Sequence, residues 1–495
     1  MPDASAILAG ELQGDEKRVV LIHQGRHLTL GEFRRDIDSF AQGLTGHLQA
    51  GDLLAIDLPN GPAILALILA CFRTGVVPVP LAPGLKWPEL EPILQKARPR
   101  ALISHRTFSE AQLQSLATCV AEIRPDIWLT PAGSSPFSAD DESAGKHTLS
   151  ADPERLALVL HTSGSSGLPK GVMLAYRSLR HILDYRLDHC ELGPGSVAVV
   201  ASCLSQTVGL YQSLALLACG GLLVLLESYE IEAMAEAVNQ NAPTHLIMVV
   251  DPWDKLLHHP KINAHSLRRL RFAAASADKL TPLVQQRFAD LTGRQLRSSY
   301  GLTESSWAMV NPATDPSQAL AVGQPSPGVE VRLLDDAGQQ VKTGTVGQIH
   351  IRSPRNLLGY LQDEPATLAI LQDGWLATGD LAWQDSSGIY WFAGRCKDII
   401  VLATGDLVAP AEIEAVLSTH PAVKACLVAA RTSERGSLLP WAWVVPTRET
   451  TSAEMQQYLR QRLSDYKVPV GIEFVDTLPV GLSGKIQRPA ALPAG

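Results

Sequence analysis

The first third of the chain alternates helix signals with short apolar runs, and this alternation constrains the fold more than any other feature. Thr29 and Glu32 form a capping-box pattern before apolar residues at three- and four-residue spacing, which predicts a helix. The apolar run 53–58 predicts a buried strand, and a second helix is expected from the following PNGP sequence to Thr74. Because strands that alternate with helices favour βαβ units, we expect an α/β fold with largely parallel sheets.

The pattern changes near Gly394 and predicts a second, smaller domain. Pro410 stands where proline is favoured at a helix start, and signals for two strands, a helix and a further strand follow. About 100 residues with their own alternation are enough for a small domain. We therefore expect a large N-terminal domain of mixed or parallel sheets flanked by helices, and a small C-terminal α+β domain.

Composition excludes several classes of protein. The 495 residues include 42 Lys and Arg against 50 Asp and Glu, a net charge of −8 that argues against nucleic-acid binding. Hydrophobic residues make up 46% and charged ones 19%, which excludes wholesale disorder. The seven cysteines are scattered without a CxxC pair, which argues against a zinc site or a disulfide framework.

Neither the amino terminus nor the most apolar stretch reads as a membrane segment. Acidic residues interrupt the first 20 positions, so no signal peptide is predicted. Gln212 and the Gly220–Gly221 pair interrupt the apolar stretch 208–226, which favours a buried helix followed by a short strand. We expect a cytoplasmic protein with no integral membrane segment.

The strongest local signal is LVLHTSGSSGLPKGVML, residues 158–174. Glycines without Cβ let backbone N–H groups converge on an anion, four hydroxyls add donors, and Lys170 adds a movable positive charge. A loop of this kind suits a polyphosphate. It is not a Walker loop, because Pro169 stands where that motif requires glycine. The turn residues expected to bind phosphate are Thr162, Ser163, Gly164, Ser165, Ser166 and Gly167.

The ten residues 162–171 are similar to the phosphate loop of the adenylate-forming superfamily, which includes acyl- and aryl-CoA synthetases, amino-acid adenylation domains and firefly luciferase. Further motifs follow in that family's order: YGLTE (300–304), GQIHIRS (347–353), WLATGD (375–380), GRCKD (394–398), APAEIE (409–414), YKVP (466–469) and LSGKIQR (482–488). The last two look more like acyl- and aryl-CoA ligases than amino-acid adenylation domains. The resemblance therefore runs from the loop to the end of the chain.

The resemblance assigns roles around the phosphates of ATP. Activating a carboxylate with ATP depends on positioning and charge neutralisation rather than covalent chemistry by the enzyme. Glu304 is expected to hold Mg²⁺, which takes few protein carboxylates. Thr303 would contact a phosphate oxygen, and Tyr300 and Gly301 would flank the adenine and the acyl group.

Other roles fall in the second half of the motifs. Asp380 matches the family's ribose aspartate, since a carboxylate accepts hydrogen bonds from two adjacent hydroxyls. Arg395 matches the second ribose contact, with a solvated surface arginine as the alternative. Lys485 matches the mobile catalytic lysine, and Lys397 the pivot about which the small domain turns. The resemblance thus implies a large domain over 1–393, a hinge over 394–397 and a small mobile domain over 398–495.

The region of the acyl pocket departs from the family pattern. The residues expected to line the pocket, with ordinary core positions as the alternative, are Ser205, Gln206, Val250, Ala274 and Ser276. Gln206 falls where amino-acid adenylation domains keep an aspartate for the substrate ammonium. Because a buried ammonium without a charged partner is unfavourable, an α-amino acid is a poor substrate candidate.

Taken together, these residues predict an enzyme that converts a carboxylic acid and ATP to acyl-AMP and pyrophosphate, then transfers the acyl group to the thiol of coenzyme A. One alternative keeps the adenylation and uses the phosphopantetheine arm of a separate acyl or peptidyl carrier protein. Another is an adenylate-binding protein without turnover, suggested by the altered pocket. A luciferase-type oxygenation is also compatible with the motifs, whereas a P-loop phosphotransferase is not.

Overall fold

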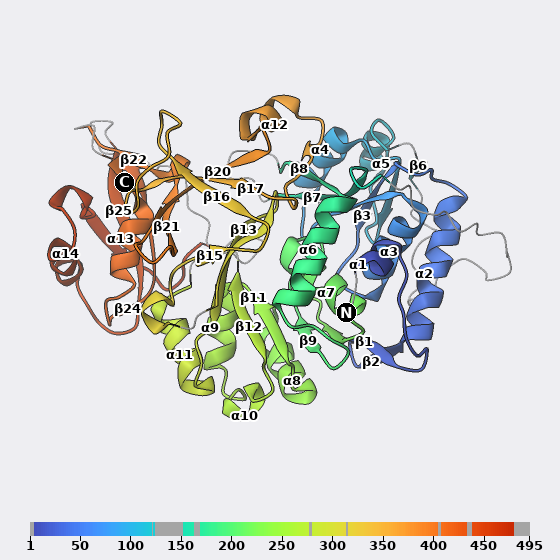
Figure 1. The fold of residues 1–495 in the computed structure, drawn as a ribbon, viewed down its shortest axis with the longest axis horizontal. Helices are drawn as coiled ribbons and strands as arrows, with labels where there is room; N and C mark the ends of the chain where they lie inside the picture. The colour runs from blue at the N-terminus through green and yellow to red at the C-terminus, as the bar shows by residue number, and fades with distance from the viewer. Residues whose placement is uncertain are drawn as a thin grey trace.

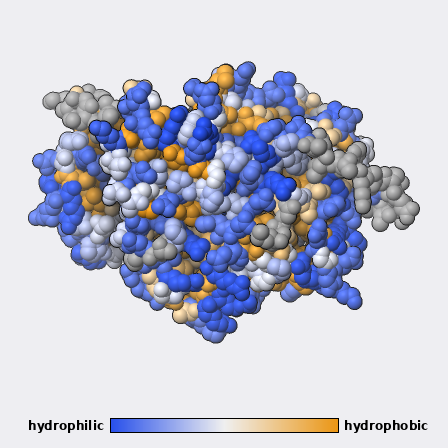
Figure 2. Space-filling view, viewed as in Figure 1, coloured by the Kyte–Doolittle hydropathy of each residue, from blue (hydrophilic) through white to orange (hydrophobic). Residues whose placement is uncertain are grey.

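The structure is a computed structural model that describes residues 4–120, 122–123, 152–162, 169–276, 280–312, 315–403, 407–432 and 438–479. Figure 1 shows a broad N-terminal part, coloured blue to yellow, and a smaller C-terminal part, coloured orange to red, at one end of the molecule. Figure 2 shows the same face, where hydrophobic residues appear in patches between hydrophilic ones. No helix of the described chain is long and apolar enough to cross a bilayer.

The largest sheet has nine strands in the order β15-β14-β13-β12-β11-β9-β10-β1-β2. Its strands are β1 (Val19–His23), β2 (Arg26–Thr29), β9 (Val197–Val200), β10 (Leu222–Leu225), β11 (His245–Met248), β12 (Phe272–Ser276), β13 (Arg297–Leu302), β14 (Ser306–Asn311) and β15 (Gln324–Pro325). The strands from β1 to β13 in this order pair in parallel, whereas β2, β14 and β15 add antiparallel edges.

Helices cover both faces of this sheet (Figure 1). They are α1 (Ala4–Leu8), α2 (Leu30–Thr45), α3 (Pro62–Thr74), α6 (Tyr176–His189), α7 (Thr207–Ala218), α8 (Ile231–Asn241), α9 (Val250–His258), α10 (Ala264–Leu267) and α11 (Pro282–Thr292). Successive side chains of β9 point to opposite faces of the sheet and pack against different helices. Ala198 and Val200 pack with α2, α3, α6 and α7, whereas Val199 between them packs with α8, α9 and α11.

Two smaller sheets complete the N-terminal region and share one apolar core. A parallel sheet consists of β3 (Leu53–Asp57), β4 (Val77–Pro80), β5 (Ala101–Ser104) and β6 (Glu122–Ile123), accompanied by α4 (Trp87–Ala97) and α5 (Glu110–Leu116). An antiparallel sheet consists of β7 (Leu156–His161), β8 (Gly171–Ala175) and β18 (Gly359–Tyr360). The predicted phosphate loop joins β7 to β8.

A wholly antiparallel sheet follows, and the alternation pattern did not predict it. It consists of β16 (Glu330–Leu334), β17 (Gly347–Arg352), β19 (Leu371–Gln372), β20 (Trp375–Gln384) and β21 (Tyr390–Arg395), with η1 (Pro316–Gln318) before it and α12 (Glu364–Ile370) inserted. The alternation of helices and strands in the first third of the chain does not continue here. The large region is a mixture of parallel and antiparallel sheets.

The C-terminal region has its own core, which includes Ile413, Val428 and Met455. Its elements are η2 (Cys396–Asp398), β22 (Ile400–Val401), β23 (Leu407–Val408), α13 (Pro410–Leu417), β24 (Val423–Thr432), β25 (Leu438–Pro446), α14 (Ser452–Arg460), η3 (Asp465–Lys467) and β26 (Gly471–Phe474). This is the small α+β domain that the sequence predicts.

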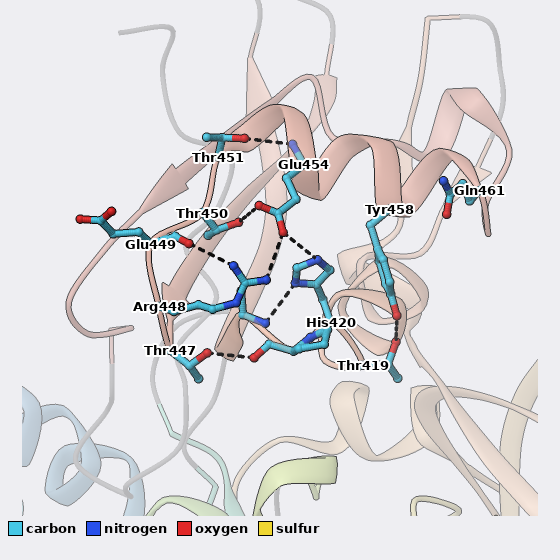
Figure 3. Close-up of polar contacts among 12 residues, drawn as sticks. Thr419, His420, Thr447, Arg448, Glu449, Thr450, Thr451, Glu454, Tyr458 and Gln461 are labelled. Atoms are coloured by element: carbon cyan, nitrogen blue, oxygen red, sulfur yellow. Dashed lines mark hydrogen bonds and ion pairs between the residues drawn. The ribbon is translucent and has the colours of Figure 1, made fainter.

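A polar network fixes the start of α14 in this domain (Figure 3). Thr451 caps the helix by accepting from the N–H of Glu454. The Glu454 carboxylate in turn accepts from the Thr450 hydroxyl at 2.8 Å and from Arg448 at 3.3 Å, and it lies 3.6 Å from His420. The network therefore ties α14 to the segment that follows α13.

Candidate active site

The base of the predicted phosphate loop is a β-hairpin. His161 and Gly171 are cross-strand partners, and the Thr162 N–H donates to the carbonyl oxygen of Lys170 at 3.0 Å. The chain returns as a strand, so α6 begins only at Tyr176 and its N-terminus does not follow the loop directly. Of the predicted loop residues, Ser163, Gly164, Ser165, Ser166 and Gly167 lie outside the described residues. Their role stays a prediction.

Tyr360, which the sequence analysis missed, contacts both Lys170 and Glu304. The Lys170 ammonium is 4.8 Å from the ring centroid of Tyr360, and the Tyr360 hydroxyl donates to Glu304 Oε1 at 2.7 Å. Burial and the neighbouring Glu304 carboxylate raise the pKa of Tyr360, so the hydroxyl stays protonated and donates. Only one Glu304 oxygen accepts this bond.

Backbone hydrogen bonds hold this arrangement in place. The Leu361 N–H donates to the carbonyl of Gly171 at 2.7 Å, and the Leu357 N–H donates to the carbonyl of Glu304 at 2.8 Å. The segment 357–361 thus joins the phosphate hairpin to the turn that carries Glu304. A lysine, a tyrosine and a glutamate from three distant segments meet as a result.

Thr303 and Glu304 occupy the tight turn between β13 and β14. Gly301 makes this turn possible, because a Cβ there would lie 2.1 Å from the carbonyl oxygen of Ser306. The predicted residues Tyr300, Gly301, Thr303 and Glu304 therefore follow one another at the carboxyl end of a parallel strand. Ligands of α/β sheets bind at this edge.

Asp380 and Arg395 lie on the other side of Tyr300. The Tyr300 hydroxyl donates to Asp380 Oδ2 at 2.8 Å, and Arg395 Nε is 3.2 Å from Asp380 Oδ1. Asp380 and Arg395 are cross-strand partners on β20 and β21, so Asp380 sits within a strand rather than in a turn. About half of the Arg395 side chain is exposed, and its contact with the ribose stays a prediction.

The environment of Asp380 shifts its protonation. Burial raises the pKa of this carboxyl, and the positive charge of Arg395 opposes the rise. Burial and the Asp380 charge also raise the pKa of Tyr300 well above its usual value, so Tyr300 acts as a hydrogen-bond donor. Tyr300 contacts Asp380, and Glu304, four residues later, contacts Tyr360 beside Lys170. Both sets of contacts therefore lie near the carboxyl end of β13.

The predicted pocket residues lie in three parts of the chain. Ala274 and Ser276 lie on β12, where the Trp307 indole N–H donates to Ser276 Oγ at 3.1 Å and Ala274 packs near Trp307. Ser205 and Gln206 immediately precede α7. Val250 begins α9 and packs in the core on the opposite face of the sheet. The structure thus brings Ala274 and Ser276 together at Trp307, while Val250 packs apart from them.

The predicted hinge falls at the end of β21 and in η2. Lys397 lies on the surface, and its neighbour Cys396 is the exposed cysteine among the seven. Across the two regions, Lys424 Nζ of β24 is 3.7 Å from Asp254 Oδ2 of α9. Lys485 lies outside the described residues, so its position stays a prediction.

Comparisons with known proteins agree with this arrangement. The sequence profile described as AMP-binding enzyme matches residues 9–361, and the profile described as AMP-binding enzyme C-terminal domain matches residues 412–485. A feruloyl-CoA synthase from Amycolatopsis sp. is 32% identical and the alignment covers 94% of each chain. The fatty acid–[acyl-carrier-protein] ligase ScoC from Streptomyces coeruleorubidus is 28% identical over 94% of this chain and 91% of ScoC. The crystal structure of ATP-bound MatB from Rhodopseudomonas palustris superposes with a TM-score of 0.86 at 25% identity, over 97% of each chain.

Proposed function

This chain belongs to the AMP-binding enzymes as an adenylate-forming acid–thiol ligase, and we propose that it makes an acyl-AMP and passes the acyl group to coenzyme A. In the first step a carboxylate oxygen of the acid attacks the α-phosphorus of ATP, and the bond to pyrophosphate breaks. In the second, the thiol sulfur attacks the acyl carbonyl carbon and AMP leaves. Cytoplasmic location stays a prediction.

The observation that carries the proposal is the continuous set of contacts along the β13 edge. Asp380 and Arg395, the proposed ribose contacts, lie at one end, and Tyr300 joins them to the turn with Thr303 and Glu304. Tyr360 then joins Glu304 to Lys170 and the hairpin of the phosphate loop. Their order along the edge supports the proposed order of contacts, from the ribose through the metal to the phosphates.

The residues also fit a Mg²⁺ ion that arrives with the nucleotide. Mg²⁺ prefers oxygen ligands and keeps several waters, so one carboxylate beside the phosphates is enough to bind it. Glu304 has one oxygen bonded to Tyr360 and a second that can accept the ion. When bound, Mg²⁺ would neutralise charge on the phosphates, while Glu304 orients it.

The acid and the acceptor are tested by two assays on the full chain. Screening carboxylic acids for AMP and pyrophosphate release tests adenylation, and an enzyme that releases neither with any acid would contradict the proposed function. Offering coenzyme A or a phosphopantetheine-loaded carrier protein to the same enzyme tests the acceptor. The similarity to ScoC makes a carrier protein the second candidate for the acceptor. If the enzyme acylates a carrier protein faster than coenzyme A, the proposed acceptor is the carrier protein.

We predict that Asp380→Ala weakens the use of ATP. Loss of a carboxylate that accepts from the ribose should raise the KM for ATP about 10- to 100-fold, the usual effect of a hydrogen bond to a charged group. Because burial raises the pKa of Asp380, the wild-type KM for ATP should rise as the pH falls toward the acid range, when the carboxylate becomes protonated. The variant should lack this part of the pH dependence.

The matched control is Asp290→Ala, which removes an exposed aspartate on α11. In steady-state kinetics with ATP as the varied substrate, this variant should have the wild-type KM for ATP and the wild-type turnover. An Asp380→Ala enzyme with the wild-type KM for ATP and wild-type turnover would contradict the ribose role.

A further inference from the structure

The guanidinium of Arg186 lies buried in the large domain without a charged partner. Arg186 on α6 is only 2% exposed, and its Nε and Nη1 atoms have no hydrogen-bond partner. Its guanidinium carbon lies 3.9 Å from a ring centroid of Trp307 and 6.0 Å from that of Tyr211. Within the described residues no carboxylate pairs with it. An unpaired buried charge is strongly unfavourable, so this position calls for an explanation.

Two more arginines lie over neighbouring aromatic rings, and we call Arg186, Arg297 and Arg355 the arginine cluster. The Arg355 guanidinium lies 4.0 Å from the ring of Tyr185, and its Nη1 donates to the Trp307 carbonyl at 2.8 Å. The Arg297 guanidinium lies 4.5 Å from the ring of Phe272, which itself stacks on Trp307. Positive charge is therefore concentrated around Trp307.

The charges of the arginine cluster affect the protonation of His189. Burial and the charges of the three arginines lower the pKa of His189 to about 4, with the exposed Glu191 acting in the opposite direction. His189 is therefore neutral at pH 7 and stacks on Tyr185 at 4.9 Å. The three arginines therefore add to the effect of burial in disfavouring a positive charge on this ring.

The Tyr211 hydroxyl of α7 also lacks a hydrogen-bond partner. It is buried, and the Tyr211 ring centroid lies 6.0 Å from the Arg186 guanidinium carbon. The guanidinium offers only donors, and the Tyr211 hydroxyl can donate as well. A carboxylate, which accepts hydrogen bonds and carries negative charge, would satisfy both groups.

The arginine cluster borders the predicted acyl pocket. Trp307, over which Arg186 lies, donates to Ser276, and α7 begins directly after Gln206. Resting on the proposed function, we infer that the acid substrate is a dicarboxylic acid, whose second carboxylate binds the guanidinium of Arg186. The first carboxylate is the one that reacts with ATP. Arg186 thus selects the substrate and takes no part in the chemistry.

The test compares dicarboxylic acids with their monomethyl esters, which keep one carboxylate and nearly the same size. A panel of aliphatic and aromatic pairs is assayed for AMP formation with the wild-type chain and with Arg186→Met. For the best pair we expect wild type to favour the diacid by about 100-fold in kcat/KM, the upper range for a hydrogen bond to a charged group. Arg186→Met should lose this preference and keep activity with the ester.

Thermal melting without ligand gives an independent readout. Because Arg186→Met replaces an unpaired buried charge by an apolar side chain of similar length, its melting temperature should equal or exceed that of wild type. The diacid should raise the melting temperature of wild type more than the ester does, and this difference should vanish in the variant. Arg332→Met is the matched control, since Arg332 lies over Trp375 at 4.1 Å outside the arginine cluster.

Two results would overturn the inference. Wild type could use the esters as well as the diacids, or Arg186→Met could keep the preference for diacids, whether or not the variant is more stable. If Arg186→Met does not fold, Arg186→Lys keeps the charge with fewer donors and should keep only part of the diacid preference. Failure to form AMP with any acid would instead contradict the proposed function, while the melting shifts would still test the diacid site.

Discussion

Lys485→Ala should reduce acid-dependent formation of acyl-AMP by about 100- to 1,000-fold, the usual effect of removing one group that stabilises developing negative charge. Negative charge gathers between the acid and the α-phosphate as they approach, and the role proposed for Lys485 is to neutralise it. Transfer from a supplied acyl-adenylate to the thiol should stay largely intact, because that step starts after the phosphate chemistry. The measurements are pyrophosphate exchange into ATP and thioester formation from synthetic acyl-AMP.

The reverse pattern is expected for Lys397→Pro, which would restrict the proposed pivot. This enzyme should still adenylate and should lose the second step. Lys342→Ala removes an exposed lysine of the β16–β17 connection and serves as the control for both. Equal losses in the two half-reactions of Lys485→Ala would contradict its assignment to the first.

Glu304→Gln should lower turnover in the adenylation step by about 100-fold, because it removes the charge proposed to orient Mg²⁺ while keeping the shape of the side chain. The amide oxygen can still accept from Tyr360, so the turn should keep its structure. We also expect half-maximal activity to need more Mg²⁺ than in wild type. Titrating Mg²⁺ at saturating ATP and acid measures this shift.

Tyr360→Phe tests whether the hydrogen bond that orients Glu304 matters as much as the charge of its carboxylate. This variant keeps the carboxylate and loses only the 2.7 Å hydrogen bond, so its loss of turnover should be less than about 10-fold. Glu330→Gln removes an exposed carboxylate paired with Arg352 and should behave as wild type. An unchanged Mg²⁺ requirement in Glu304→Gln would contradict the metal role.

Local signals predicted much of the fold because they act between near neighbours in the sequence. Thr29 and Glu32 do form reciprocal capping bonds at the start of α2. The predicted second helix is α3, which ends at Thr74 before Gly75 in the left-handed conformation. In the small domain, Pro410 begins α13 as expected. Each of these boundaries depends on a few adjacent residues.

Pairings between distant segments escaped the sequence analysis. Asp380 lies in a ten-residue strand whose neighbours β17 and β21 determine its place, and no local pattern in the sequence predicts that pairing. Tyr360 was missed because its partner Glu304 is 56 positions away and a Gly-Tyr pair carries no signature of chemistry. Arg186 was missed for a related reason: an arginine on a helix ordinarily faces water. Only packing against Trp307 shows otherwise.

The exposed cysteine at the junction of the two regions allows a direct test of whether the smaller region rotates. Cys396 sits between Arg395 and Lys397, while the other six cysteines are buried or partly covered. A fluorophore attached there would sense any turning of the smaller lobe during the catalytic cycle, without new cysteines having to be engineered. Partial burial of the sulfur and the nearby Asp380 charge raise the pKa of this thiol, so the labelling reaction should be run at mildly alkaline pH.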